Sequence, residues 1–148
     1  EVGFTHVPYR GGGPAVVDVV AGHVESLFVT LPAAIEHIRG GRLKALAVSS
    51  AARGGALPEV PTVAESGFAG FDMVTWQGIL ATAGTPEPVV ARLHAALIEA
   101  LRRPEVADGL RNQGFEVTGT SPGAFAALIR EESARWPGVV RLAGAQLD

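Results

Sequence analysis

The chain of 148 residues contains no cysteine and a single lysine, Lys44. The absence of cysteine excludes disulfides, thiolate catalysis and cysteine-based zinc sites, and it is compatible with any compartment. A formal net charge of −3 argues against a nucleic-acid partner, which requires a basic surface. No apolar run is long enough to span a bilayer, and we expect no signal peptide in the sequence that starts at Glu1. We therefore expect part of a longer protein, large enough for one domain with a core of its own.

Residues 7–15, VPYRGGGPA, are the most informative stretch of the chain. A β-prone run precedes three glycines, and a proline and an Ala/Val-rich run follow them, which predicts a strand, a glycine loop and a helix. Proline suits a first helical turn because its missing N–H has no intrahelical partner there. Free N–H groups and the positive end of the helix dipole favour an anion at such a site. A tight turn that binds nothing explains the glycines equally well.

The first fifty residues alternate between strand and helix patterns. Strands are predicted at 4–9, 24–30 and 43–49, and helices at 14–21 and 31–39. The continuous apolar run 27–29 is typical of a strand buried on both faces of a parallel sheet. The order βαβαβ implies right-handed crossovers and an α/β sheet.

Caps and prolines mark the elements expected in the remainder of the chain. A capping box of Thr62 and Glu65 predicts a short helix over 62–66. A long strand is predicted over 71–81, a short one over 115–117, and helices follow Thr85, start at Pro104 and follow Ser121. We expect Pro137 to kink or break the last helix.

A second candidate site lies at the strand-to-helix junction 28–32. In open α/β sheets, ligands bind beyond the carboxyl ends of the strands, where Thr30 would offer its hydroxyl and the amides behind it. An N-cap role for Thr30 is the competing explanation. Ser49 ends the third predicted strand at the same edge and is a weaker candidate.

Other chemistry finds little support in the sequence. The glycine loop lacks the Gly-Lys-Ser/Thr ending of a P-loop and the spacing of a dinucleotide fingerprint. The four histidines form no metal-ligand pattern, and no catalytic constellation is recognisable. We therefore expect no metal, no cofactor and no enzyme, and a carboxylate as the simplest anion. Two alternatives stay open: an enzyme domain that binds a phosphate-bearing ligand, and an interaction or sensor module that needs no ligand.

Several motifs together resemble one known family. They are the stretch 7–15, LKALAVSS at 43–50, LPEVPTVAESG at 57–67, AGTP at 83–86, and the ending with ExxRW at 132–136 and AGAxLD at 143–148. The chain resembles, over almost its whole length, the substrate-binding proteins of tripartite tricarboxylate transporters, also called the Bug family. Members are two-lobed periplasmic receptors that close over small carboxylates, often dicarboxylates, and deliver them to a membrane permease.

The resemblance implies a type II periplasmic-binding-protein-like α/β fold in the bacterial periplasm. Residues 1–72 would form most of the second lobe around the βαβαβ core, and residues 73–148 a crossover strand and helices of the first lobe. The chain would correspond to the C-terminal half of a receptor, so exposed apolar helix faces predict self-association or a rearranged fold. Ligand contacts would come, largely through backbone groups, from Tyr9, Gly11, Gly12, Gly13, Pro14, Ala15, Thr30, Leu31, Pro32 and Ser49.

Overall fold

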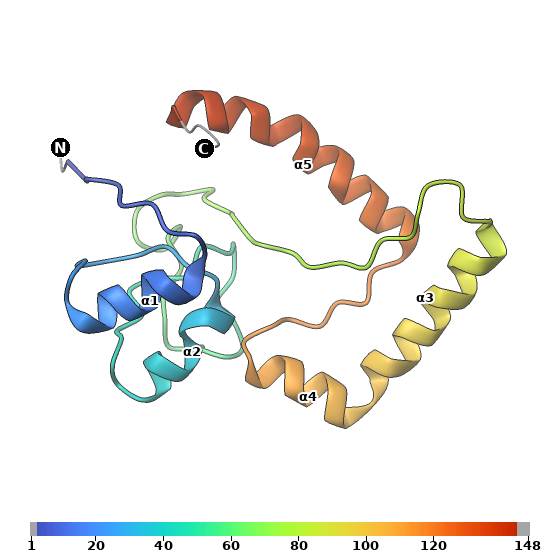
Figure 1. Cartoon of the computed structure of the whole chain (residues 1–148), viewed down its shortest axis with the longest axis horizontal. Coiled ribbons are helices and arrows are strands. Elements are labelled where there is room, and N and C mark those ends of the chain that lie inside the picture. The colour runs from blue at the N-terminus through green and yellow to red at the C-terminus, as the bar shows by residue number, and fades with distance from the viewer. Residues whose placement is uncertain (1–2, 145–148) are drawn as a thin grey trace. The chain divides into compact units, whose positions relative to one another are not determined.

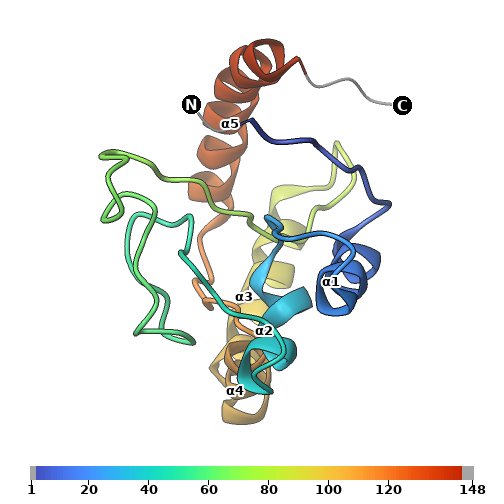
Figure 2. The ribbon, with the colours of Figure 1, turned by 90° about the vertical axis from the view of Figure 1, so that its left-hand side faces the viewer.

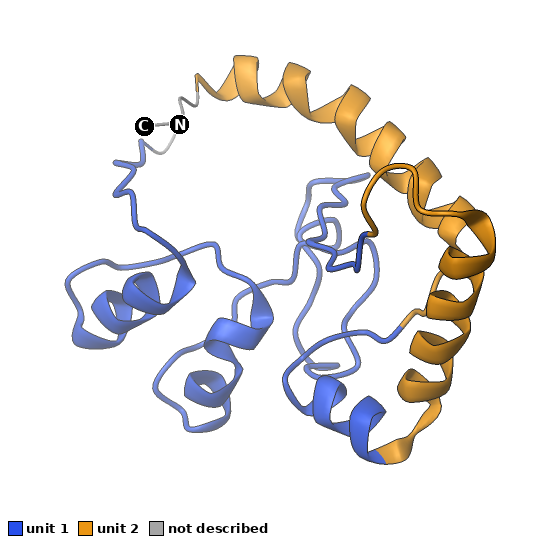
Figure 3. Cartoon of the chain, turned by 45° about the vertical axis from the view of Figure 1, so that its right-hand side comes forward, with its two compact units in different colours: residues 1–80, 105–117 blue, residues 81–104, 118–148 orange. Residues whose placement is uncertain are grey.

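A computed structural model describes residues 3–144, which form helices joined by extended segments and turns (Figure 1). The chain divides into two compact units (Figure 3). The first unit comprises residues 1–80 and 105–117, and the second comprises residues 81–104 and 118–148. The helices of the described residues are α1 (Gly12–Ala21), α2 (Leu31–Arg39), α3 (Glu87–Arg102), α4 (Pro104–Asn112) and α5 (Pro122–Ala143).

The predicted βαβαβ core is not confirmed. Within residues 3–144, the segments expected as strands (4–9, 24–30, 43–49, 71–81 and 115–117) contain no assigned strand, and the β pairing present is one isolated parallel bridge between Val48 and Thr62. Alternating and β-branched residues favour an extended backbone, but a strand also needs a neighbour at hydrogen-bonding distance. In the described residues this pairing amounts to the Val48–Thr62 bridge and one bond from the Met73 amide to the Ser49 carbonyl, and it does not extend into a ladder. The predicted helices therefore form while the sheet between them is not seen.

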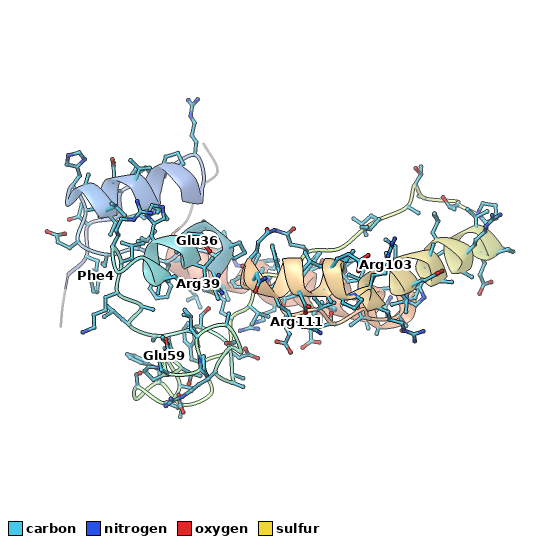
Figure 4. All side chains as sticks on the ribbon, turned by 90° about the horizontal axis from the view of Figure 1, so that it is seen from below. Phe4, Glu36, Arg39, Glu59, Arg103 and Arg111 are labelled. Atoms are coloured by element: carbon cyan, nitrogen blue, oxygen red, sulfur yellow. The ribbon has the colours of Figure 1, made fainter. Side chains whose placement is uncertain are left out.

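The buried residues of the described chain lie in the first unit. Val16 on α1, Ile35 on α2 and Ala107 on α4 are each at most 6% exposed. Helices α1 and α2 pack against each other. The Arg39 guanidinium donates to the Asn112 carbonyl oxygen at 2.8 Å and to the Glu36 carboxylate beside it at 3.1 Å (Figure 4). Because α1 begins within the glycine loop, the packing of α1 in this unit also positions the loop.

A hydrogen-bonded turn replaces the short helix predicted at 62–66. The capping-box bonds are nevertheless present: Thr62 Oγ1 accepts from the Glu65 amide at 3.0 Å, and Glu65 Oε2 accepts from the Thr62 amide at 2.7 Å. The Arg53 guanidinium also donates to the Glu65 carboxylate, at 2.9 Å. The box is satisfied within one turn and does not require a helix to follow it.

In the second unit, the caps of α3 and α5 test two predictions. Ser121 caps α5 as expected, with its hydroxyl oxygen accepting from the Ala124 amide at 3.2 Å. Thr85 does not cap α3; its hydroxyl donates to the Thr82 carbonyl at 2.7 Å, and Pro86 is the N-cap.

Helix α5 continues through Pro137, so of the predicted kink or break, the break is wrong and the kink stays a prediction. Proline removes a single intrahelical hydrogen bond, and this helix has no buried described residue, so water can reach the freed carbonyl. No described helix combines the length and apolar character that crossing a lipid bilayer demands. The last residues of the AGAxLD motif, 145–148, lie outside the described residues.

Candidate functional site

The first turns of α1 and α2 lie against each other, so the structure brings together the two segments that the sequence singled out (Figure 2). Gly12 lies at this contact. A Cβ atom built on Gly12 would lie 2.8 Å from Val29 Cγ2 and 3.2 Å from the Ala33 Cβ. A side chain at position 12 would therefore push the two helix starts apart.

The three glycines of the loop have three different environments. Gly11 is the N-cap of α1 and has φ 130° and ψ 172°, a conformation that glycine adopts far more readily than other residues. Gly12 is pressed against α2. Around the Cβ position of Gly13, in contrast, no heavy atom lies within 4 Å. The same is true of Gly11, so a ligand can approach the backbone of the loop at Gly11 and Gly13 but not at Gly12.

Helices α1 and α2 begin without charge compensation from their own side chains. Neither has a side-chain N-cap hydrogen bond or an acidic residue in its first turn. The other described helices differ, since α3 has Glu87 and α4 has Glu105 in the first turn, while Ser121 caps α5. The positive ends of the α1 and α2 dipoles therefore converge with no acidic residue in the first turn of either helix.

Helix α1 begins two residues earlier than predicted, and this changes which amides are available. Gly12 and Gly13 are its first two residues, and Pro14 has no N–H. Ala15 is the fourth helical residue, and helix geometry pairs its amide with the Gly11 carbonyl. The geometry therefore favours Gly12 and Gly13 over Ala15 as donors.

At the start of α2, Thr30 is the N-cap residue. This is the role that the sequence offered as the alternative to a ligand contact. Its hydroxyl makes no capping hydrogen bond, while its carbonyl oxygen accepts from the Ala33 amide at 3.0 Å. Leu31, the first residue of this helix, has a free amide to offer, whereas Pro32 has no N–H. The Thr30 hydroxyl is thus not committed to the helix cap.

Tyr9 contacts α1 through its hydroxyl, which donates to Asp18 Oδ2 at 2.7 Å. The other carboxylate oxygen lies 3.3 Å from His23 Nδ1. The Tyr9 bond, helped by His23, lowers the pKa of Asp18, and the same bond, with burial and the carboxylate charge, raises the pKa of Tyr9. Sequence reasoning missed Asp18, although it is the one acidic residue within the apolar helix GGPAVVDVVA.

Ser49 takes part in a different network from the helix starts. Its carbonyl oxygen accepts from the Met73 amide at 2.8 Å, and the preceding residue, Val48, bonds to Pro61 and Val63. The contacts recorded for Ser49 in the described residues thus link it to 61–73 rather than to the glycine loop. Its predicted ligand contact stays a prediction, as do those of the other nine candidates.

The converging amides can hold an oxyanion such as a carboxylate or a phosphate. Among residues 3–144, no group of three or more His, Asp or Glu side chains is placed to bind a metal ion.

Comparison with known proteins gives a consistent match. The family model described as "Tripartite tricarboxylate transporter family receptor" matches residues 1–144. A Pseudomonas sp. (strain P51) protein, "UPF0065 protein in tcbD-tcbE intergenic region", is 42% identical over 137 residues, which cover 92% of this chain and 41% of that protein.

Solved structures match the chain over a similar share of their length. An R. palustris protein with adipate has a TM-score of 0.83 at 33% identity, covering 93% of this chain and 46% of its own. MatC from Rhodopseudomonas palustris with bound malate has a TM-score of 0.80 at 37% identity, covering 90% and 47%. The periplasmic binding protein BugD has a TM-score of 0.84 at 32% identity, covering 98% and 49%. The chain thus spans less than half the length of these proteins.

Proposed function

The chain belongs to the tripartite tricarboxylate transporter receptor family, and from this premise we propose that it is the carboxylate-binding part of an extracytoplasmic solute receptor. The ligand is a small carboxylate, in particular a dicarboxylate. One carboxylate group sits at the starts of α1 and α2 and accepts hydrogen bonds from the amides of Gly12, Gly13 and Leu31. The proposal does not assign an enzymatic reaction to this site.

The observation that carries the proposal is the meeting of two uncompensated helix N-termini at Gly12. Two relatives of this fold hold dicarboxylates, adipate and malate, which agrees with an anion site built from backbone donors. Backbone amides at a helix N-terminus bind an anion without a charged side chain, so the glycine loop needs no charged residue to hold a carboxylate.

The strength of this half-site sets limits on the mechanism. A helix dipole stabilises a nearby anion by about 0.3–1 kcal/mol when exposed and by up to about 2 kcal/mol when partly buried. Two helix ends together therefore give weak binding. Tight capture requires a second binding surface that closes over the ligand and excludes water, as in hinge closure between two lobes.

The wider role follows from the family and is proposed for the whole receptor. Residues 1–72 would belong to one lobe, and residues 73–148 would contribute the crossover and helices of the other. The receptor would capture its ligand in the bacterial periplasm and deliver it to the membrane permease of the transporter. The periplasmic setting is supported by the structural match to BugD.

The experiment is an amide-resolved NMR titration of the chain with adipate and with malate. We expect saturable shifts of the Gly12, Gly13 and Leu31 amides, and none with the neutral diamide of adipate. Inorganic phosphate and a magnesium nucleotide serve as comparison ligands. Stronger shifts with these two would favour the phosphate-binding enzyme and contradict the carboxylate proposal.

Two glycine variants make the titration specific. Gly13→Val should abolish the carboxylate shifts without unfolding, because the Cβ position of Gly13 has open space around it. Gly123→Val is the matched control, since Gly123 is also the second residue of a helix with no heavy atom within 4 Å of its Cβ position. Equal binding by Gly13→Val and Gly123→Val would remove the glycine loop from the site.

A further inference from the structure

Helix α2 presents one stripe of residues to the end of helix α4. Leu31, Ile35 and Arg39 are spaced by four residues, so they lie on one face along the whole length of α2. Gly114 lies against the first two, since a Cβ atom built on it would be 2.8 Å from Leu31 Cγ and 3.3 Å from Ile35 Cδ1. The guanidinium of Arg39 donates to the Asn112 carbonyl oxygen at 2.8 Å. The end of α4 therefore contacts α2 at its first turn, its middle and its last turn.

The end of α4 is a closed helix terminus with a fixed backbone. The Gly114 amide donates to the Arg111 carbonyl at 2.8 Å, and the Phe115 amide donates to the Leu110 carbonyl at 3.1 Å. With the left-handed φ of 86° at Gly114, these two bonds form a Schellman motif. The motif does not use the carbonyl of Asn112, which instead receives the guanidinium from α2. Helix α2 is thus held by a terminus that cannot easily change shape.

The first turn of α2 is contacted from its other face by α1. Gly12 lies against Ala33, whereas Gly114 lies against Leu31. Because successive helical residues are about 100° apart, these two side chains point about 200° apart around the axis of α2. The two glycines therefore hold opposite faces of the turn that carries the Leu31 amide.

We propose that Gly114 and Arg39 are positioning residues of the carboxylate site, which act on the ligand through Leu31. Gly114 sets the place of the first turn of α2, and Arg39 keeps the far end of α2 on α4. The inference rests on the proposed function, because it concerns the aim of an amide that would bind the ligand. Arg39 lies eight residues beyond Leu31, about 12 Å along the helix axis, and its guanidinium is directed at Asn112, so it does not bind the ligand itself.

Arg39→Met tests this role at the end of α2 that is remote from the ligand. Methionine keeps an unbranched apolar stem and a similar helix propensity, but it has no donor for the Asn112 carbonyl. The Arg39 side chain is 41% exposed, so its replacement does not open the core. Circular dichroism should therefore show unchanged helix content.

Arg111→Met is the matched control on α4. Arg39 and Arg111 each lie in the last turn of their helix (Figure 4). Each pairs with the acidic residue three positions earlier, Arg39 with Glu36 at 3.1 Å. The corresponding distance from Arg111 to Asp108 is 3.0 Å, and this hydrogen bond stays within α4. The two variants therefore lose the same charge and the same kind of ion pair, but only Arg39→Met loses the bond between the two helices.

The readout is the amide-resolved titration with adipate. In the parent chain and in Arg111→Met, we expect the Leu31 and Gly13 amides to shift together. In Arg39→Met, the saturating shift of Leu31 should fall relative to that of Gly13, and the Kd for adipate should rise by about three- to tenfold, because one charge-assisted hydrogen bond is weakened. A general loss of stability would lower both shifts alike. Arg39→Lys should restore most of the Leu31 shift, because its ammonium group can donate to the same carbonyl.

The failure of this inference can be told from the failure of the proposed function. Equal titrations of Arg39→Met and Arg111→Met would overturn the positioning role and leave carboxylate binding standing. A parent chain without saturable shifts would contradict carboxylate binding itself.

A measurement without ligand decides whether Arg39 holds α2 on α4. The Cβ position of Gly114 is occupied by a hydrogen that points at Leu31, so a nuclear Overhauser effect should join the Gly114 Hα to the Leu31 methyl groups. We expect it in the parent chain and in Arg111→Met, and a weaker one in Arg39→Met. An unchanged effect in Arg39→Met would overturn the proposal, whatever the chain binds.

Discussion

The hydroxyl of Tyr9 donates a 2.7 Å hydrogen bond to the carboxylate of Asp18. Tyr9 lies just before the glycine loop and Asp18 lies in the second half of α1, so this bond ties the entry of the loop to the helix. The sequence predicted Tyr9 as a ligand contact, and this stays a prediction, but its hydroxyl proton is directed at the helix. Tyr9 is thus best interpreted as a positioning residue that holds the entry to the loop. Its side chain limits how far residues 9–11 can move away from the first turn of α1.

Tyr9→Phe should weaken carboxylate binding severalfold while leaving the helices intact. The phenyl ring keeps the packing but loses the bond to Asp18, so the loop amides become less well ordered. The measurement combines the NMR titration with amide hydrogen exchange at Gly12 and Gly13. Asp18→Asn, which retains an acceptor oxygen, should bind more strongly than Tyr9→Phe, and equal binding by Tyr9→Phe and the parent chain would exclude the positioning role.

The same pair predicts how stability depends on pH. The pKa of Asp18 in the folded chain lies below its ordinary value of 3.8, so its contribution is present above 3.8 and is lost as the pH falls through the lower folded value. The pKa of Tyr9 is raised above 10.0, so its contribution is present below 10.0 and is lost as the pH rises through the higher folded value. Denaturant unfolding at a series of pH values should show both losses.

Tyr9→Phe separates these two contributions from the rest of the chain. It should abolish the alkaline loss and reduce the acidic one. Part of the acidic loss should persist, because the Arg53 guanidinium and the Thr62 amide hold the pKa of Glu65 below its ordinary value of 4.5. A pH profile identical to that of the parent chain would show that the Tyr9–Asp18 bond does not stabilise the fold.

Local signals predicted the helices α1 to α5, whereas the predicted helix at 62–66 is a turn and the predicted sheet is not confirmed. Helix α2 was predicted with its observed bounds, since Pro32 and Gly40 mark its two ends within the chain itself. A strand depends on a neighbour that can be remote in sequence, and among the described residues the extended segments make only isolated pairings, at Val48 and Thr62 and at Ser49 and Met73. The same distinction applies to the site: the glycine loop could be found from residues 7–15, whereas the contact of Gly12 with Val29 depends on how α1 and α2 pack.

Alanine substitutions at Gly12 and at Gly13 should have opposite effects on the free energy of unfolding. Gly13→Ala should stabilise the chain by about 0.5–1 kcal/mol, because alanine has the higher helix propensity and the new methyl group meets open space. Gly12→Ala should destabilise it by about 1–3 kcal/mol through the clash with Val29 and Ala33. Denaturant unfolding measures both, and a stabilising Gly12→Ala would show that the two helix starts are not tightly packed.

Thr62→Val tests the capping box, because Thr62 is only 1% exposed. Valine preserves the shape but leaves the Glu65 amide without its acceptor, so the free energy of unfolding should fall by about 1 kcal/mol. Thr62→Ser retains the hydroxyl and should recover most of that loss apart from the methyl group. If Thr62→Val is as stable as the parent chain, the hydrogen bond to the hydroxyl contributes no more than the methyl group that replaces it.

Gly114 combines a left-handed backbone with a close contact to the candidate site, and these two demands can be measured separately. Its φ is 86°, and a Cβ on it would lie 2.8 Å from Leu31 Cγ, at the first residue of α2. Gly22 has a similar φ of 78° with open space around its Cβ position, so Gly22→Ala should cost only the backbone strain, about 1–2 kcal/mol. Gly114→Ala should cost about 1–3 kcal/mol more, because it also displaces Leu31. Denaturant unfolding of both variants gives this difference, and equal losses would show that Leu31 moves aside freely and that α2 is not held in place by Gly114.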